Sequence, residues 1–93
     1  MLMNMPNNQT KIKLNPDVIL QRIGNEMILI NLKTEQIYSL NHTAARFIEL
    51  LEIGKSLEDI ESQIIQEYDV EPNVLHQDIL QMINSLRLKN FFA

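Results

Sequence analysis

The side chains that could carry acid–base or metal chemistry are few in this chain. His42 and His76 form neither a His-x3-His pair nor an HExxH motif, so their spacing does not predict a zinc site. The carboxylates of Glu58, Asp59 and Glu61 stand close together in sequence, as a general acid–base pair could. Acidic residues in the first turn of a helix also complement its dipole, and we favour that interpretation.

Other catalytic motifs are absent from the 93 residues. Gly24 and Gly54 are the only glycines, so neither a GxGxxG nor a GxxxxGK[ST] loop can be written. None of the four serines stands in a nucleophile elbow, and Ser56 is better explained as a helix cap. With no cysteine there can be no disulfide, thiolate or Cys-based zinc site. We therefore predict no enzymatic activity, no metal and no cofactor.

The composition is that of one globular domain, with 45% hydrophobic and 22% charged residues. A net charge of -4 disfavours nucleic acid, because duplex binding depends on Lys and Arg neutralising phosphates. No apolar run approaches the roughly 20 residues that span a bilayer, and no secretory signal is recognisable. We expect a cytoplasmic protein that binds no membrane.

The first part of the chain predicts an antiparallel β-meander. Residues 1–15 read as a flexible polar arm, and residues 16–93 as the folded domain. Strands are expected over 16–23, around 27–30 and over 36–40, with a tight turn at Gly24-Asn25. The middle run is apolar on both faces, which is typical of a central strand covered on both sides. In this order the third strand lies at an edge of the sheet.

Helical patterns fill the rest of the chain. Asn41 or Thr43 can cap the first helix, and Gly54 can end it. Ser56 opens a second helix, and Pro72 suits the first turn of a third. The apolar stripes expected on the three helices are Ala44, Phe47, Ile48 and Leu51; Leu57, Ile60, Ile64 and Tyr68; and Leu75, Ile79, Met82, Ile83 and Leu86. Strands followed by helices predict an α+β domain.

An edge strand beside a long helix can bind an extended peptide by strand addition. The strand over 36–40 would supply the edge, and the third helix the opposite wall of a groove. Leu80 and Leu88 lie outside the main apolar stripe of that helix, so they are candidates for contact with something other than the core. A DNA-binding winged helix is the alternative. Its reading helix would carry Asp78 near its start, while Arg87 and Lys89 lie only at the far end.

The run from Tyr38 to Asn41, followed by Ala44 to Ile48, resembles the y-x-L-N-x-x-(a/g)-x-x-I-(w/f)-x-L signature of PqqD-like proteins. These are the RiPP recognition elements, which bind leader peptides of ribosomally made and modified peptides. The resemblance extends over residues 16–92. It implies a winged helix-turn-helix-like fold with three strands and three helices, and a non-catalytic domain that presents a precursor to a maturation enzyme.

The resemblance also implies where a leader would bind. It would add as a strand beside the third strand and pack against the third helix. The residues expected at this site are Ile37, Tyr38, Ser39, Leu40, Leu75, Asp78, Ile79 and Met82. The turn over 31–35 lacks the Tyr-Pro-Glu segment associated with pyrroloquinoline quinone synthesis. It is similar to stand-alone elements of lasso-peptide clusters, whose partner is a leader peptidase. A chaperone of quinone or other radical-SAM peptide maturation is the alternative.

Overall fold

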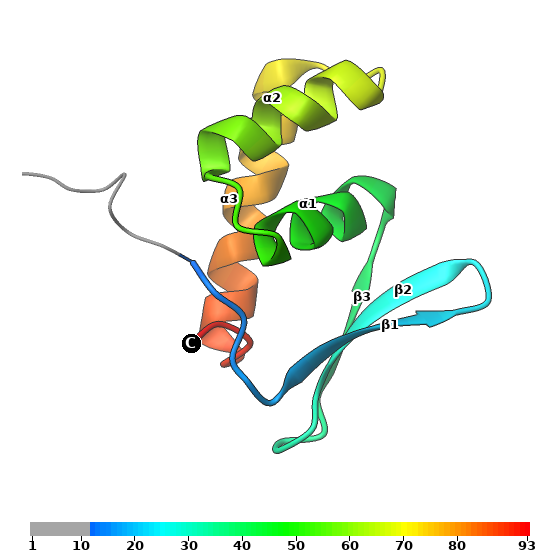
Figure 1. Cartoon of the computed structure of the whole chain (residues 1–93), viewed down its shortest axis with the longest axis vertical. Coiled ribbons are helices and arrows are strands. Elements are labelled where there is room, and N and C mark those ends of the chain that lie inside the picture. Colours follow the sequence, from blue (N-terminus) through cyan, green and yellow to red (C-terminus); the bar gives the residue numbers. More distant parts are fainter. Residues whose placement is uncertain (1–11) are drawn as a thin grey trace, which may run out of the picture.

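The computed structural model describes residues 12–93, which form an antiparallel sheet followed by helices (Figure 1). The strands are β1 (Val18–Ile23), β2 (Glu26–Asn31) and β3 (Ile37–Leu40). The helices are α1 (His42–Glu52), α2 (Leu57–Glu67) and α3 (Pro72–Leu88). The strand order is β1-β2-β3, so the predicted meander and the edge position of β3 are confirmed.

Each hairpin has its own turn chemistry. Ile23 pairs with Glu26, so Gly24 and Asn25 form a two-residue loop. Gly24 has a φ of 61°, which fits the first central position of a type II′ turn. The β2–β3 turn is longer and holds Glu35 at a φ of 66°, an unusual conformation for a residue other than glycine.

The two faces of the sheet differ in what covers them. The face carrying Leu29 packs against the core, where Leu29 is fully buried. On the other face Ile19, Ile30 and Ile37 form one cross-strand row, and Ile37 is 61% exposed. Ile28 is buried on that outer face but lies outside the core cluster. The expectation that β2 is covered on both sides therefore holds only in part for the outer face, where Ile28 is buried and Ile30 is half-buried, while the central position of β2 is confirmed.

Local hydrogen bonds start the helices where the sequence predicted. Asn41 caps α1, because its side-chain oxygen accepts from the backbone N–H of Ala44 at 2.8 Å. Ser56 caps α2 through the N–H of Asp59 at 3.1 Å. The carboxylate of Glu71 caps α3, with Pro72 in its first turn. Of the two residues considered for the first cap, the structure selects Asn41.

The predicted apolar stripes form most of the core. Phe47, Ile60 and Leu86 are fully buried, and α2 and α3 bury the faces that were predicted for them. The first helix differs in two respects: Leu50 is buried although the predicted stripe did not include it, and the buried alanine is the neighbouring one. Ala45 is buried, whereas Ala44 is half-buried at the surface beside α3. Within residues 12–93, no helix combines the length and apolarity needed to cross a bilayer.

The end of α3 is a Schellman motif. The N–H of Phe91 bonds to the carbonyl of Leu86 at 2.9 Å, and that of Asn90 to Arg87 at 3.2 Å. Asn90 has a φ of 64°, the left-handed conformation that this motif requires. The turn sends Phe91 back under the sheet, where its side chain is fully buried.

The C-terminal tail pairs with residues that precede β1. Leu14 forms a bridge with Phe92, and the N–H of Asn15 bonds to the carbonyl of Phe91 at 2.9 Å. Ile12 and Leu14 also pack on the core. The flexible arm had been expected to run to residue 15. The pairing shows that residues 12–15 belong to the folded part, while residues 1–11 lie outside the described residues.

Asn31, at the end of β2, is the buried polar residue of the sheet. Its side-chain oxygen accepts from the N–H groups of Lys33 and Thr34 at 2.9 and 3.1 Å. Its side-chain amide donates to the carbonyl of Asn90 at 3.2 Å. One side chain therefore orders the β2–β3 turn and ties the sheet to the end of α3.

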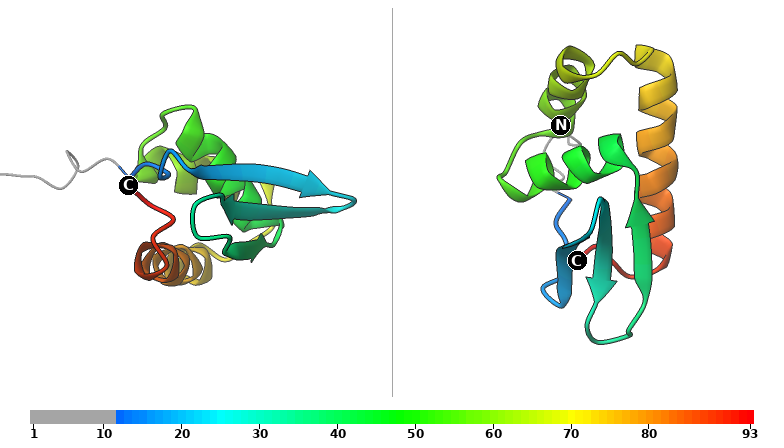
Figure 2. Two further views of the ribbon diagram at one scale, coloured as in Figure 1. Left: turned by 90° about the horizontal axis from the view of Figure 1, so that it is seen from below. Right: turned by 90° about the vertical axis from the view of Figure 1, so that its right-hand side faces the viewer.

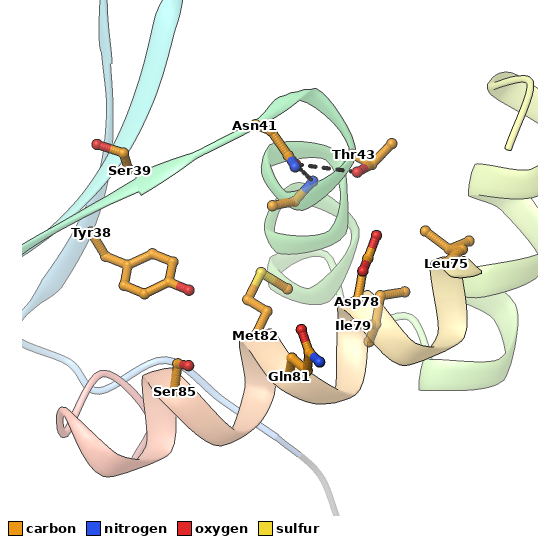
Figure 3. A pocket seen from close by; sticks show the side chains of 11 residues that line it. Tyr38, Ser39, Asn41, Thr43, Leu75, Asp78, Ile79, Gln81, Met82 and Ser85 are labelled. Carbon is orange, nitrogen blue, oxygen red and sulfur yellow. Dashed lines mark hydrogen bonds between the residues drawn. The ribbon is translucent and has the colours of Figure 1, made fainter. Parts of the chain in front are cut away.

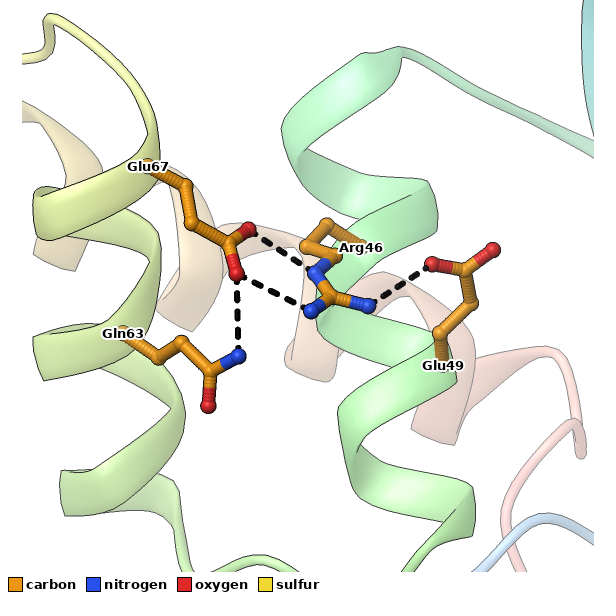
Figure 4. A network of polar contacts seen from close by, with 4 residues as sticks. All are labelled: Arg46, Glu49, Gln63 and Glu67. Carbon is orange, nitrogen blue, oxygen red and sulfur yellow. Dashed lines mark hydrogen bonds and ion pairs between the residues drawn. The ribbon is translucent and has the colours of Figure 1, made fainter.

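An ion-pair network joins α1 to α2 (Figure 4). The guanidinium of Arg46 donates to both oxygens of Glu67, at 2.8 and 2.9 Å, and to Glu49 at 3.3 Å. Gln63 also donates to Glu67. Hydrogen bonds from Arg46, and then from Gln63, lower the pKa of Glu67 from 4.5 to about 2. The Arg46 and Glu67 side chains are about one-third exposed, so solvent weakens this pair.

Replacing Asn31 should destabilise the fold. Asn31→Ala removes the acceptor of two turn N–H groups and leaves the Asn90 carbonyl with only the longer bond from the Asn15 side chain, at 3.4 Å. We expect a loss of about 1–3 kcal/mol in unfolding free energy. Urea denaturation measures this. Asn84→Ala is the matched control, since Asn84 is exposed on α3 and its side chain makes no hydrogen bond within residues 12–93. Equal midpoints for the two variants would contradict the role of Asn31.

The Glu67 pair should make stability depend on pH. Because the folded-state pKa is depressed, the stabilisation is present above pH 4.5 and is lost as the pH falls toward 2. The difference in melting temperature between wild type and Glu67→Gln should therefore be largest near neutral pH and shrink below pH 4.5. Glu52→Gln controls for removing one exposed helical carboxylate. A difference in melting temperature between wild type and Glu67→Gln that stayed constant down to pH 3 would contradict this pH dependence.

Candidate functional site

A hollow of about 340 Å³ lies between β3 and α3 (Figure 3). We call it the β3–α3 groove. The residues that line it are Tyr38, Ser39, Asn41, Thr43, Ala44, Leu75, Asp78, Ile79, Gln81, Met82 and Ser85. They come from the edge strand, from the start of α1 and from one side of α3. The groove is thus built by segments roughly forty positions apart in the sequence.

The direction of the two walls fixes which residues face each other. β3 and α3 run in opposite directions along the groove (Figure 2). Tyr38 accordingly lies near the C-terminal end of α3, and Asn41 near its N-terminal half (Figure 3). The Tyr38 ring packs edge-on against Phe91, with 6.1 Å between centroids. Lys89 Nζ stands 5.5 Å from the centroid of the same ring. The buried tail therefore holds Tyr38 in place.

The hydrogen-bond register leaves alternate backbone groups of β3 unpaired. Asn31 N–H bonds to the carbonyl of Gln36, so residue 36 directs its backbone groups toward β2. Hydrogen-bonded and non-hydrogen-bonded pairs alternate along an antiparallel ladder. Tyr38 and Leu40 therefore share bonds with β2, while the N–H and C=O groups of Ile37 and Ser39 face the open edge. Another extended chain could use these groups.

The groove has an apolar floor and a polar rim. Leu75, Ile79 and Met82 are 3%, 4% and 7% exposed, so they serve the core and the floor together. Hydroxyl and amide groups supplied by both walls form the rim (Figure 3). Asp78 is the charged member of the lining, and no ion pair or hydrogen bond engages its carboxylate within residues 12–93. Such a surface suits an extended peptide with alternating side chains.

The structure brings six of the eight predicted site residues to the groove: Tyr38, Ser39, Leu75, Asp78, Ile79 and Met82. Ser39 borders the groove as part of the strand edge, because its side chain shares the outer face of the sheet with that of Ile37 (Figure 3). The side chains of the other two residues lie outside the groove lining. Ile37 is on the outer face of the sheet, and Leu40 is 8% exposed in the core. Leu80 and Leu88 are exposed on α3 outside the groove lining. The Ile37 backbone nevertheless belongs to the open edge.

Five lining residues were not among the predicted site residues: Asn41, Thr43, Ala44, Gln81 and Ser85. Helical periodicity could have identified Ser85, which lies three positions after Met82 and seven after Asp78. Asn41 and Thr43 had been considered solely as caps. Ala44 had been assigned to the core, and nothing in the local sequence distinguishes it from Ala45.

The part of the chain that the structure describes assembles no metal-binding cluster. No group of three or more His, Cys, Asp or Glu side chains within residues 12–93 could hold a metal ion. His76 is half-exposed and lies 2.9 Å from Glu61, where it links α3 to α2. His42 borders a smaller hollow on the other side of the β3–α1 junction. The groove itself combines an unpaired backbone edge with apolar and polar side chains.

Comparisons with known proteins agree with this geometry. The family model of coenzyme PQQ synthesis protein D, PqqD, matches residues 26–91. A solved structure of TbiB1 in complex with the TbiA(beta) leader peptide is 29% identical, with a TM-score of 0.76, over 86% of this chain and 93% of that one. A lasso peptide synthetase B1 complexed with the leader peptide is 25% identical, with a TM-score of 0.79, over 90% and 99%.

A search of curated proteins finds no match to this sequence. The family model nevertheless spans β2, β3 and nearly all that follows, including both walls of the groove. The predicted order of three strands and three helices is shared with the two solved structures. The chain therefore belongs to the PqqD family, as its resemblance to PqqD-like RiPP recognition elements implied.

Proposed function

We propose that this protein binds the leader region of a ribosomally synthesised precursor peptide in the β3–α3 groove. The leader adds as a further strand along β3, and its side chains on one face pack against α3. The residues we assign to direct contact are Ile37, Tyr38 and Ser39 in the edge strand and Leu75, Asp78, Ile79 and Met82 on α3. Leu40 supports the strand from the core, because its backbone pairs with β2 and its side chain is buried. The observation that carries the proposal is an open strand edge facing an apolar helical wall across one groove.

Two further observations support a leader as the occupant. Both solved structures to which the chain is similar are complexes with leader peptides, and they cover most of this chain. The outward groups at Ile37 and Ser39 supply two donors and two acceptors, spaced as a β-ladder requires. Backbone pairing gives affinity, and groove contacts give specificity.

We further propose that the bound leader is presented to a leader peptidase of lasso-peptide maturation. One of the two similar structures is named a lasso peptide synthetase, whereas the family description names coenzyme PQQ synthesis. A role in quinone or other radical-SAM peptide maturation is therefore the second candidate. Measuring which precursor leader the protein binds separates the two, since each pathway has its own precursor.

Proline at Ser39 should weaken leader binding. Ser39→Pro removes an outward N–H, and its ring obstructs the approach of a guest strand. We expect affinity for a fluorescent leader from the neighbouring precursor gene to fall by about two- to tenfold from the lost hydrogen bond, which contributes about 0.5–1.5 kcal/mol, and further through the obstructing ring. Fluorescence anisotropy gives the Kd.

The matched control is Arg22→Pro. By the same alternation, Arg22 N–H points away from β2 on the opposite edge of the sheet. This variant should bind the leader as wild type does. Equal affinity of a folded Ser39→Pro variant, or binding of a scrambled leader as tight as that of the native one, would refute strand addition at β3.

Presentation to a peptidase predicts a gain in cleavage rate. Adding the protein to its cluster's leader peptidase and precursor should accelerate leader removal, and Ser39→Pro should reduce that acceleration in proportion to its lost affinity. Mass spectrometry of the released core peptide follows the reaction. An equal rate of leader removal with and without the protein would contradict the presentation role and would leave the proposal of leader binding unaffected.

A further inference from the structure

The groove carries opposite charges at its two ends. Asp78, Met82 and Ser85 follow one another at helical spacing on the side of α3 that lines the groove, and Lys89, the residue that caps the end of the helix, continues this series just beyond the lining. Asp78 lines the groove toward Asn41 and Thr43 (Figure 3). Lys89 stands over the Tyr38 ring at the other end. The stripe therefore begins with a carboxylate, continues through a thioether and a hydroxyl, and ends with an ammonium group.

These two charges are available to a guest. Both residues are exposed, and no ion pair engages either side chain within residues 12–93. Lys89 makes a cation–π contact with Tyr38, which leaves its hydrogen-bond donors free for an acceptor. Between them the wall is apolar or uncharged, so a charge placed mid-groove would lose solvent without gaining a partner.

We infer that the groove selects peptides with a basic residue beside Asp78 and an acidic residue beside Lys89. The inference rests on the proposed function and adds what distinguishes one guest from another. Because β3 has an open edge along its whole length, backbone pairing alone would accept a guest in either direction. The charge pair removes that ambiguity, since the reversed guest would place like charges together at both ends.

The helix fixes the spacing of the two charges in the guest. Lys89 lies eleven positions after Asp78, which is about 16 Å at a rise of 1.5 Å per residue. A strand covers that distance in about five residues, and side chains that face the same wall recur at every second position. The basic and acidic residues of the guest should therefore be about four or six positions apart.

Selection from a randomised peptide library displayed between neutral linkers tests the inference. Wild type should enrich peptides with one basic and one acidic residue at that spacing and in one dominant order. The exchange Asp78→Lys with Lys89→Glu should enrich the opposite order. The exchange Glu52→Lys with Lys55→Glu, at the exposed end of α1, leaves the net charge equally unchanged and should retain the wild-type order. An unchanged order after the groove exchange overturns the inference.

A second double variant, in which both charges are removed, tests the inference even if the charge-exchange variant does not fold. Asp78→Asn with Lys89→Gln, checked by circular dichroism, should bind the selected peptides more weakly and lose the preference for charge order; a retained preference overturns the inference. For one selected peptide made by synthesis, exchanging its basic and acidic residues should raise the Kd for wild-type protein about tenfold at low salt, and less at high salt. No difference between the two peptides also overturns it.

Failure of the proposed function would look different. In that case wild type would enrich no peptide family, or Ser39→Pro would bind the enriched peptides as tightly as wild type does. The third possible outcome is a set of peptides that bind wild type and lose affinity with Ser39→Pro but show no preferred charge order. That outcome would support strand addition and would overturn only the inference about charge order.

Discussion

The Schellman turn at Asn90 is the constraint on which the rest of the structure depends. It reverses the chain after α3 and buries Phe91 beneath the sheet, where the ring also supports Tyr38. Asn31 then holds the turn from the β2 side by donating to the Asn90 carbonyl. One end of α3 is thereby fixed to the sheet, while its other half packs against α2. Because α3 is held at its ends, it can stand apart from β3 and leave the groove between them.

The position of α3 beside β3 also bears on a general risk of β-sheets, which is unspecific pairing at an open edge. An open edge invites pairing with any exposed strand, which leads to aggregation or domain swapping. Here α3 stands beside the edge as a second wall, so a guest must fit its side chains against Leu75, Ile79 and Met82 as well as pair its backbone. Any strand that paired with the open groups of Ile37 and Ser39 would therefore also have to fit against α3.

Much of the fold was predictable because its signals are local. The edge position of β3 followed from short turns between successive strands, and the α3 stripe from its periodicity. The site was predictable in part, since six of its side chains lie on the elements that the resemblance indicated. The exposure of the outer face of the sheet could not be predicted. A strand with apolar residues on both faces has the same sequence pattern whether or not a helix covers its second face.

The sequence by itself determined the elements and their ends. The caps Asn41 and Ser56, the proline that opens α3 and the turn at Gly24 all act within a few residues, so the chain encodes them locally. The tertiary structure alone decided which backbone groups of β3 stay open, that Ser85 and Thr43 share a groove with Tyr38, and that Asp78 and Lys89 lie at its opposite ends. These features depend on register and on the meeting of distant segments, and no short-range pattern carries that information.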